Sequence, residues 1–89
     1  MAKKRRKLNK DFEKKIYSSK KNVELVLAKI YDIDDEDIQK EYMSAFNEVV
    51  YLYDALKEAY DEKGFNEDSE ELLTNYKNSF NLFESEFEI

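Results

Sequence analysis

Hydrophobic residues recur every three to four positions through three segments of the chain. In the first segment they form the stripe Phe12, Ile16, Ser19, Val23, Val26 and Ile30, which includes one serine and is widened by Leu8 and Leu27. This period places the stripe along one face of an α-helix. We therefore predict a first helix over about residues 9–31.

A run of acidic residues between Ile33 and Ile38 predicts the start of a second helix. Asp34 is the expected N-cap, because its carboxylate can accept a hydrogen bond from the amide of Asp37 three positions later. Ile33 and Ile38 occupy the positions of a hydrophobic staple around that cap. The positive end of the helix dipole also stabilises the negative charges of these acids.

The second helix is predicted over about residues 35–63 and carries two adjacent apolar stripes. One consists of Ile38, Tyr42, Ala45, Val49, Leu52, Leu56 and Ala59, and the other of Met43, Phe46, Val50, Tyr53 and Tyr60. Together they cover roughly 200° of the helix, so this helix should contact neighbours on both sides. Gly64 should end it in a left-handed conformation, with Tyr60 and Phe65 as the contacting pair of a Schellman motif.

A third helix is predicted over about residues 68–87. Asn66 or Asp68 is the expected cap, with Asp68 and Glu71 in capping-box spacing. Its stripe consists of Leu73, Tyr76, Phe80, Phe83 and Phe87, with Leu72 alongside.

The fold class that follows is all-α. Short connections favour an antiparallel up-down-up three-helix bundle, and spacings near 3.5 residues favour coiled-coil-like packing. We expect a flexible basic arm over residues 1–8 and a single three-helix domain over residues 9–89. A helical homodimer built on the same stripes is the structural alternative.

The composition narrows the chemistry that this chain can carry. In 89 residues there is no Cys, His or Pro, and the single glycine is Gly64. Disulfides, thiolate metal sites, cysteine nucleophiles and imidazole proton transfer are therefore excluded. No apolar run reaches the ~20 residues that span a bilayer. We predict a cytoplasmic protein, or a nuclear one if the host is eukaryotic.

Charge is divided along the chain. Residues 1–21 hold ten Lys or Arg against two acids, whereas residues 22–89 hold five Lys against nineteen acids. The formal net charge of −6 therefore combines a basic front with an acidic body.

The basic front gives the first candidate site, for nucleic acid or another polyanion. Its residues are Lys3, Lys4, Arg5, Arg6, Lys7 and Lys10. Such a cluster neutralises phosphates in a salt-dependent way, and it also suits anionic lipid or a nuclear-import signal. A solubilising tail, or an arm folded against its own acidic body, explains it equally well. With no aromatic residue inside the run, base stacking is not indicated.

Three apolar side chains project opposite their own stripes and give the candidate partner-binding residues: Leu25, Tyr51 and Leu82. Scattered exposed apolar groups are common in soluble proteins. Tyr51 is the strongest candidate, because Asn47, Asp54 and Glu58 surround it as a polar rim surrounds an aromatic anchor.

No catalytic residue, cofactor or metal site is predicted. Asp32, Asp34 and Glu36 alternate like the start of an EF-hand loop, but Asp37 and Met43 replace the required Gly and Glu. Ser18 and Lys21 match a Ser-x-x-Lys spacing without its supporting motifs.

We therefore expect a non-enzymatic binding or regulatory protein that acts through protein contacts, with an arm that binds nucleic acid. The second hypothesis is a small acidic inhibitor, of the phage or mobile-element kind, which mimics nucleic acid and blocks a nucleic-acid-handling enzyme. The third is a self-assembling structural protein.

Overall fold

The computed structural model describes residues 7–87, which form three helices and contain no named β-strand. These are α1 (Lys10–Tyr31), α2 (Glu36–Lys63) and α3 (Glu67–Phe87). The all-α prediction is confirmed, and every predicted helix boundary lies within one residue of the observed one.

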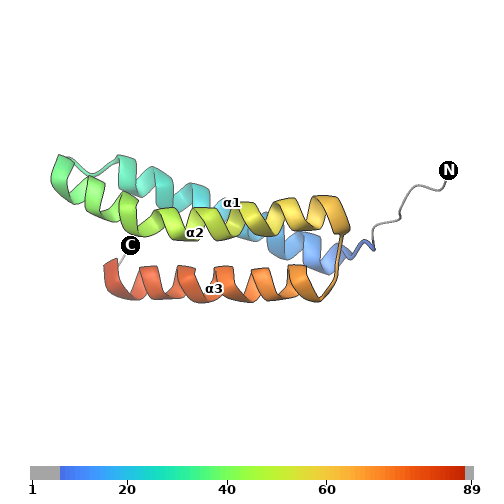
Figure 1. The fold of residues 1–89 in the computed structure, drawn as a ribbon. Coiled ribbons are helices and arrows are strands. Elements are labelled where there is room, and N and C mark those ends of the chain that lie inside the picture. The colour runs from blue at the N-terminus through green and yellow to red at the C-terminus, as the bar shows by residue number, and fades with distance from the viewer. Residues whose placement is uncertain (1–6, 88–89) are drawn as a thin grey trace.

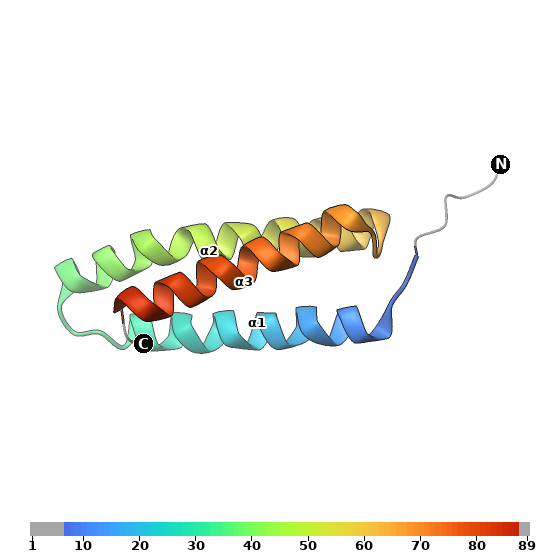
Figure 2. The same cartoon turned by 90° about the horizontal axis from the view of Figure 1, so that it is seen from below.

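The three helices lie side by side along one axis, with the turn between α1 and α2 at one end and the turn between α2 and α3 at the other (Figures 1 and 2). The molecule is a rod of 55 × 23 × 17 Å. α2 packs extensively against α3 and less so against α1, whereas close backbone approaches between α1 and α3 are few. α2 is therefore the central element, as its two stripes predicted.

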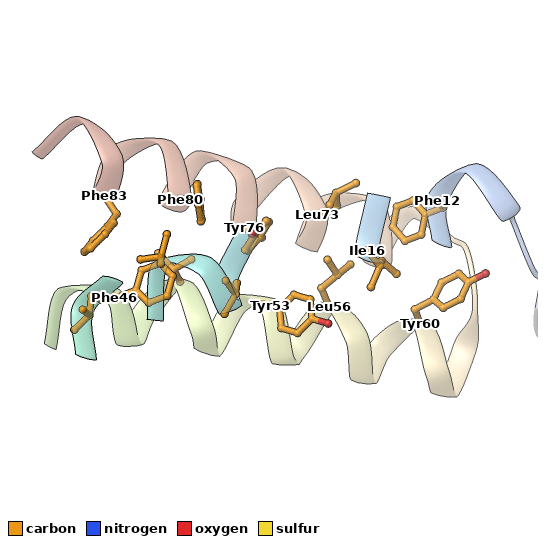
Figure 3. Close-up of a cluster of buried hydrophobic side chains, with 14 residues drawn as sticks. Phe12, Ile16, Phe46, Tyr53, Leu56, Tyr60, Leu73, Tyr76, Phe80 and Phe83 are labelled. Carbon is orange, nitrogen blue, oxygen red and sulfur yellow. The ribbon is translucent and has the colours of Figure 1, made fainter. Parts of the chain in front are cut away.

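The buried side chains form one continuous core along the rod (Figure 3). In α1 they are the six predicted residues, from Phe12 to Ile30. In α2 the buried line consists of Phe46, Val49, Tyr53, Leu56 and Tyr60. This line draws on both predicted stripes, because α2 buries the strip where the two stripes adjoin. Their outer members, such as Tyr42 and Leu52, are half-buried at the edges.

The N-terminal cap of α2 corrects one prediction. The cap is Asp35, not Asp34: Oδ1 of Asp35 accepts hydrogen bonds from the amides of Asp37 at 2.9 Å and Ile38 at 3.1 Å. Because the cap is one residue later than predicted, the fourth residue of the helix is Gln39 and not Ile38. Ile38 is exposed. The Gln39 amide donates to the carbonyls of Ile30 and Tyr31, both at 3.2 Å. The staple is therefore replaced by a polar tie to the end of α1.

The end of α2 corrects a second prediction. Gly64 has the positive φ of 78° that glycine allows, but its ψ of −154° lies outside the predicted left-handed helical conformation; its amide donates to the carbonyl of Tyr60 at 2.8 Å. The Phe65 amide does not complete the Schellman motif, because it donates to the carbonyl of Lys7 at 2.6 Å. The ring of Phe12 contacts both Tyr60 and Phe65, with centroid distances of 5.5 and 5.1 Å. Phe12 of α1 therefore packs against both members of the predicted pair.

α3 begins with a reciprocal cap between Asn66 and Ser69. The Asn66 side chain accepts from the Ser69 amide, and the Ser69 hydroxyl accepts from the Asn66 amide, both at 2.9 Å. Of the two predicted caps, the structure has Asn66, so Asp68 lies inside the first turn.

Candidate polyanion-binding face

Four exposed residues of α1 form one stripe on the side of the helix opposite the core. Lys10, Lys14, Tyr17 and Lys21 are spaced 4, 3 and 4 residues apart within a regular helix, and all are exposed. Lys14 stands two positions from both Phe12 and Ile16, about 200° around the helix from each. We call these four residues the basic face.

The acidic residues of α1 lie beside the basic face. Glu13 is directed toward α2, where its carboxylate accepts a hydrogen bond of 2.5 Å from the hydroxyl of Tyr60. The same hydroxyl accepts from the amide of Asn9 at 3.1 Å. Glu24 lies beyond Lys21, and Asp11 occupies the first turn, where a negative charge suits the helix dipole. No carboxylate therefore interrupts the line from Lys10 to Lys21.

Tyr17 is the aromatic centre of this face. Its side chain is 58% exposed, and Nζ of Lys21 lies 5.1 Å from its ring centroid, within the range of a cation–π interaction. A shallow hollow of about 530 Å³ runs along one side of the ring, lined by Lys10, Glu13, Lys14, Tyr17 and Ser18. A second hollow of about 350 Å³ runs between Tyr17 and α2.

Grouping lysines by their nearness along the chain does not reveal this face. The face is defined by the helical spacing of Lys10, Lys14, Tyr17 and Lys21. The signal was present, because this spacing repeats the pattern of the apolar stripe, displaced to the opposite side of the helix.

The predicted arm is described only in part. Lys3, Lys4, Arg5 and Arg6 lie outside the described residues. Lys7 is exposed, and its Nζ lies 5.7 Å from the ring centroid of Phe65 while its carbonyl accepts from the Phe65 amide. The main chain that enters α1 is therefore held at the turn between α2 and α3. Lys10 opens α1 and belongs to the basic face.

The helices differ sharply in charge. α1 contains six lysines against three acids, whereas α2 contains eight acids against three lysines and α3 contains six acids against Lys77. The formal charges are thus +3, −5 and −5. The division seen along the sequence therefore becomes a division between helices that lie side by side.

A groove of about 450 Å³ lies where α1 and α3 are separated. The charged residues that line it are Lys14, Lys15, Lys77 and Glu84, so three of the four are basic. At its floor the hydroxyl of Tyr76 donates to the carbonyl of Ser19 at 3.2 Å and joins the two helices. Burial raises the pKa of Tyr76 to about 12.

The structure does not gather the predicted partner-binding residues. Leu25, Tyr51 and Leu82 are exposed by 61, 70 and 61% respectively, as predicted. Each lies on the outer face of a different helix, and these faces point away from a shared core, so the three side chains do not form one patch. Whether any of them binds a partner stays a prediction.

The described residues also bear on metal binding, on membrane crossing and on the pair of Ser18 and Lys21. Within residues 7–87 no group of three acidic side chains is arranged to hold a metal ion. None of the helices there combines the length and apolar character that crossing a bilayer requires. Ser18 and Lys21 are exposed neighbours on α1, and the Lys21 ammonium lies over Tyr17.

Comparison with known proteins adds no relationship, because no family model, curated protein or solved structure matches this chain.

Proposed function

We propose that this protein is a non-enzymatic binding protein that engages a nucleic acid through the basic face of α1, extended by the N-terminal arm. The fold that we propose for it in solution is an antiparallel up-down-up bundle with coiled-coil-like packing. The observation that carries the proposal is the line of Lys10, Lys14 and Lys21 on an exposed side of α1 with no acid between them. Such a protein would act in the cytoplasm, or in the nucleus of a eukaryotic host.

Separation of charge makes this binding physically reasonable for a chain with net charge −6. If the lysines were mixed evenly with the acids, the acids would repel phosphates from every surface. With the lysines on α1 and most acids on α2 and α3, a polyanion can approach a side of the bundle where lysines outnumber acids and where the neighbouring Glu13 is hydrogen-bonded to Tyr60. Contacts with phosphates release bound counterions, which favours binding at low salt.

The test measures binding of a labelled short oligonucleotide by fluorescence anisotropy between about 50 and 200 mM salt. The variant carries Lys10→Gln, Lys14→Gln and Lys21→Gln. The matched control carries Lys40→Gln, Lys57→Gln and Lys63→Gln, which removes the same charge from acidic α2.

We expect the α1 variant to bind more weakly and to lower the slope of log K against log salt by about 2, since each lost phosphate contact removes about 0.7 from the slope for a single strand. The control should lose much less. Equal losses in the two variants, or no oligonucleotide binding by the wild type at low salt, would refute the proposal.

The acidic helices support a second candidate function, inhibition of a nucleic-acid-handling protein by charge mimicry. α2 and α3 each carry a net charge of −5, which suits a basic protein groove. This candidate predicts that a basic, DNA-binding partner is retained from host lysate after nuclease treatment. Replacing Asp54, Glu58 and Glu62 by their amides should then release it, while the α1 lysine variant should still retain it.

A further inference from the structure

Tyr17 differs from the other exposed tyrosines in its surroundings. The described residues include three tyrosines that are more than half exposed, Tyr17, Tyr31 and Tyr51. Tyr31 precedes the acidic turn at residues 32–35, and Tyr51 lies among polar and acidic side chains of α2. Tyr17 has a lysine three positions before it and another four positions after it on the same helix face. An exposed aromatic ring therefore lies within a line of exposed lysines.

The geometry of the ring suits a stacked base. With 58% of the Tyr17 side chain exposed and the Lys21 ammonium near the ring, the ring is held by a cation but remains accessible. The neighbouring hollow gives space beside the ring, with Lys10 and Lys14 at its border. Glu13 also borders this hollow, but its carboxylate is hydrogen-bonded to Tyr60.

Resting on the proposed function, we propose that Tyr17 is a stacking platform for an unpaired base, and that the basic face therefore prefers single-stranded nucleic acid to duplex. Proteins that bind single strands combine a basic track along the phosphates with aromatic side chains on which bases stack. In a duplex the bases are already stacked on one another and present only their edges in the grooves. A ring on the outside of a helix gains little from a duplex, so its contribution is specific to single strands.

The experiment compares three labelled probes of equal length at one salt concentration: an oligothymidine strand, an oligouridine strand and a mixed-sequence duplex. The variants are Tyr17→Ala and Tyr17→Phe, with Tyr51→Ala as the matched control on an acidic helix. Because Tyr17 is exposed, its replacement should leave the far-UV circular dichroism spectrum unchanged, which checks that each variant is folded.

We expect Tyr17→Ala to weaken binding of the single strands by about 10-fold, since stacking on one aromatic ring is typically worth about this factor or more. Duplex binding and the salt slope should hardly change. Tyr17→Phe should bind as the wild type does, because the ring is kept, and Tyr51→Ala should have no effect. The strand that the wild type binds more tightly, oligouridine or oligothymidine, indicates whether the source is RNA or DNA, and a loss of about 10-fold on either strand supports stacking.

Two results would overturn the inference and leave the proposed function standing. One is unchanged single-strand binding by Tyr17→Ala, and the other is an equal loss for duplex and single strand. Failure of the proposed function is recognised separately, because then the wild type binds none of the three probes at low salt.

Discussion

The two sides of α2 are held by different kinds of contact. On the α3 side, aromatic rings meet along the length of the interface: the centroid of Phe46 lies 4.8 Å from that of Phe83 and 6.1 Å from that of Phe80, and Tyr53 lies 6.1 Å from Tyr76. On the α1 side the core residues are mainly Val and Ile, and aromatic contact is concentrated at Phe12. Figure 3 shows the rings of α2 and α3 facing each other.

Hydrogen bonds supplement the apolar contacts that α1 makes with α2 and α3. The hydroxyl of Tyr60 joins α2 to Glu13 and Asn9, the hydroxyl of Tyr76 joins α3 to the main chain of Ser19, and Gln39 binds the end of α1. α2 and α3 thus share more close contacts and more aromatic contacts with each other than α2 shares with α1, while α1 carries the basic face on its outside.

The largest effect is expected at the centre of the aromatic interface. Phe46 is fully buried and contacts two rings of α3. Phe46→Ala should lower the free energy of unfolding by about 3–5 kcal/mol, through lost burial and the cavity left behind. Ile16→Val, on the α1 side, should cost only about 0.5–1.5 kcal/mol. Urea unfolding followed by circular dichroism measures both. A loss well below about 3 kcal/mol for Phe46→Ala would show that this ring contributes less than its burial indicates.

Alkaline pH should weaken the tie between α1 and α3. The pKa of Tyr76 is raised by burial to about 12 in the folded protein, from 10.0 ordinarily. Between pH 10 and 12 the Tyr76 phenol therefore stays protonated in the folded state but is ionised in the unfolded state. This contribution to stability is complete below pH 10 and disappears as the pH rises from 10 to 12, with a total on the order of 3 kcal/mol. Burial also raises the pKa of Tyr53, which acts in the same direction.

The measurement compares urea unfolding of the wild type and Tyr76→Phe at several pH values from neutral to strongly alkaline. The variant lacks the titrating phenol, so it should lose less stability than the wild type above pH 10. Parallel loss of stability in the two proteins would contradict the assignment to Tyr76.

A smaller effect is expected where α1 begins. Tyr60→Phe removes the hydroxyl that bonds to the Glu13 carboxylate and to the Asn9 amide. Since a hydrogen bond to a charged group is typically worth about 1.5–3 kcal/mol, the loss should be about 2 kcal/mol. The released carboxylate should also weaken oligonucleotide binding, because it lies beside the basic face. An unchanged affinity in this variant would show that Glu13 does not influence the face.

The smallest effect concerns the cap of α2. Asp35→Ala should cost about 1 kcal/mol, because the amides of Asp37 and Ile38 lose their acceptor. Asp34→Ala is the matched control, since it removes a neighbouring exposed charge without removing the cap. Thermal unfolding compares the two variants. A larger loss for Asp34→Ala would show that Asp34 is the capping residue, as predicted from the sequence.

Local signals account for what the sequence predicted well. The stripe from Phe12 to Ile30 and the stripe from Leu73 to Phe83 are buried as expected, since the period of an α-helix decides which side chains share a face. Gly64 ends α2 because a positive φ costs glycine little. The outward positions of Leu25, Tyr51 and Leu82 follow from the same periodicity. The basic face could also have been read from the sequence by applying that period to lysines.

Tertiary contacts decided the remainder, because they join residues that no local pattern connects. Phe12 packs against both Tyr60 and Phe65. The Lys7 carbonyl accepts the hydrogen bond of the Phe65 amide, so the expected Schellman motif is not completed. Which side chains of α2 are buried depends on where α1 and α3 pack against it. Residue type and helical period are sufficient to predict three amphipathic helices and the opposite charges of α1 and the other two. The bond between Glu13 and Tyr60 could not be predicted in this way, since it depends on where a neighbouring helix lies.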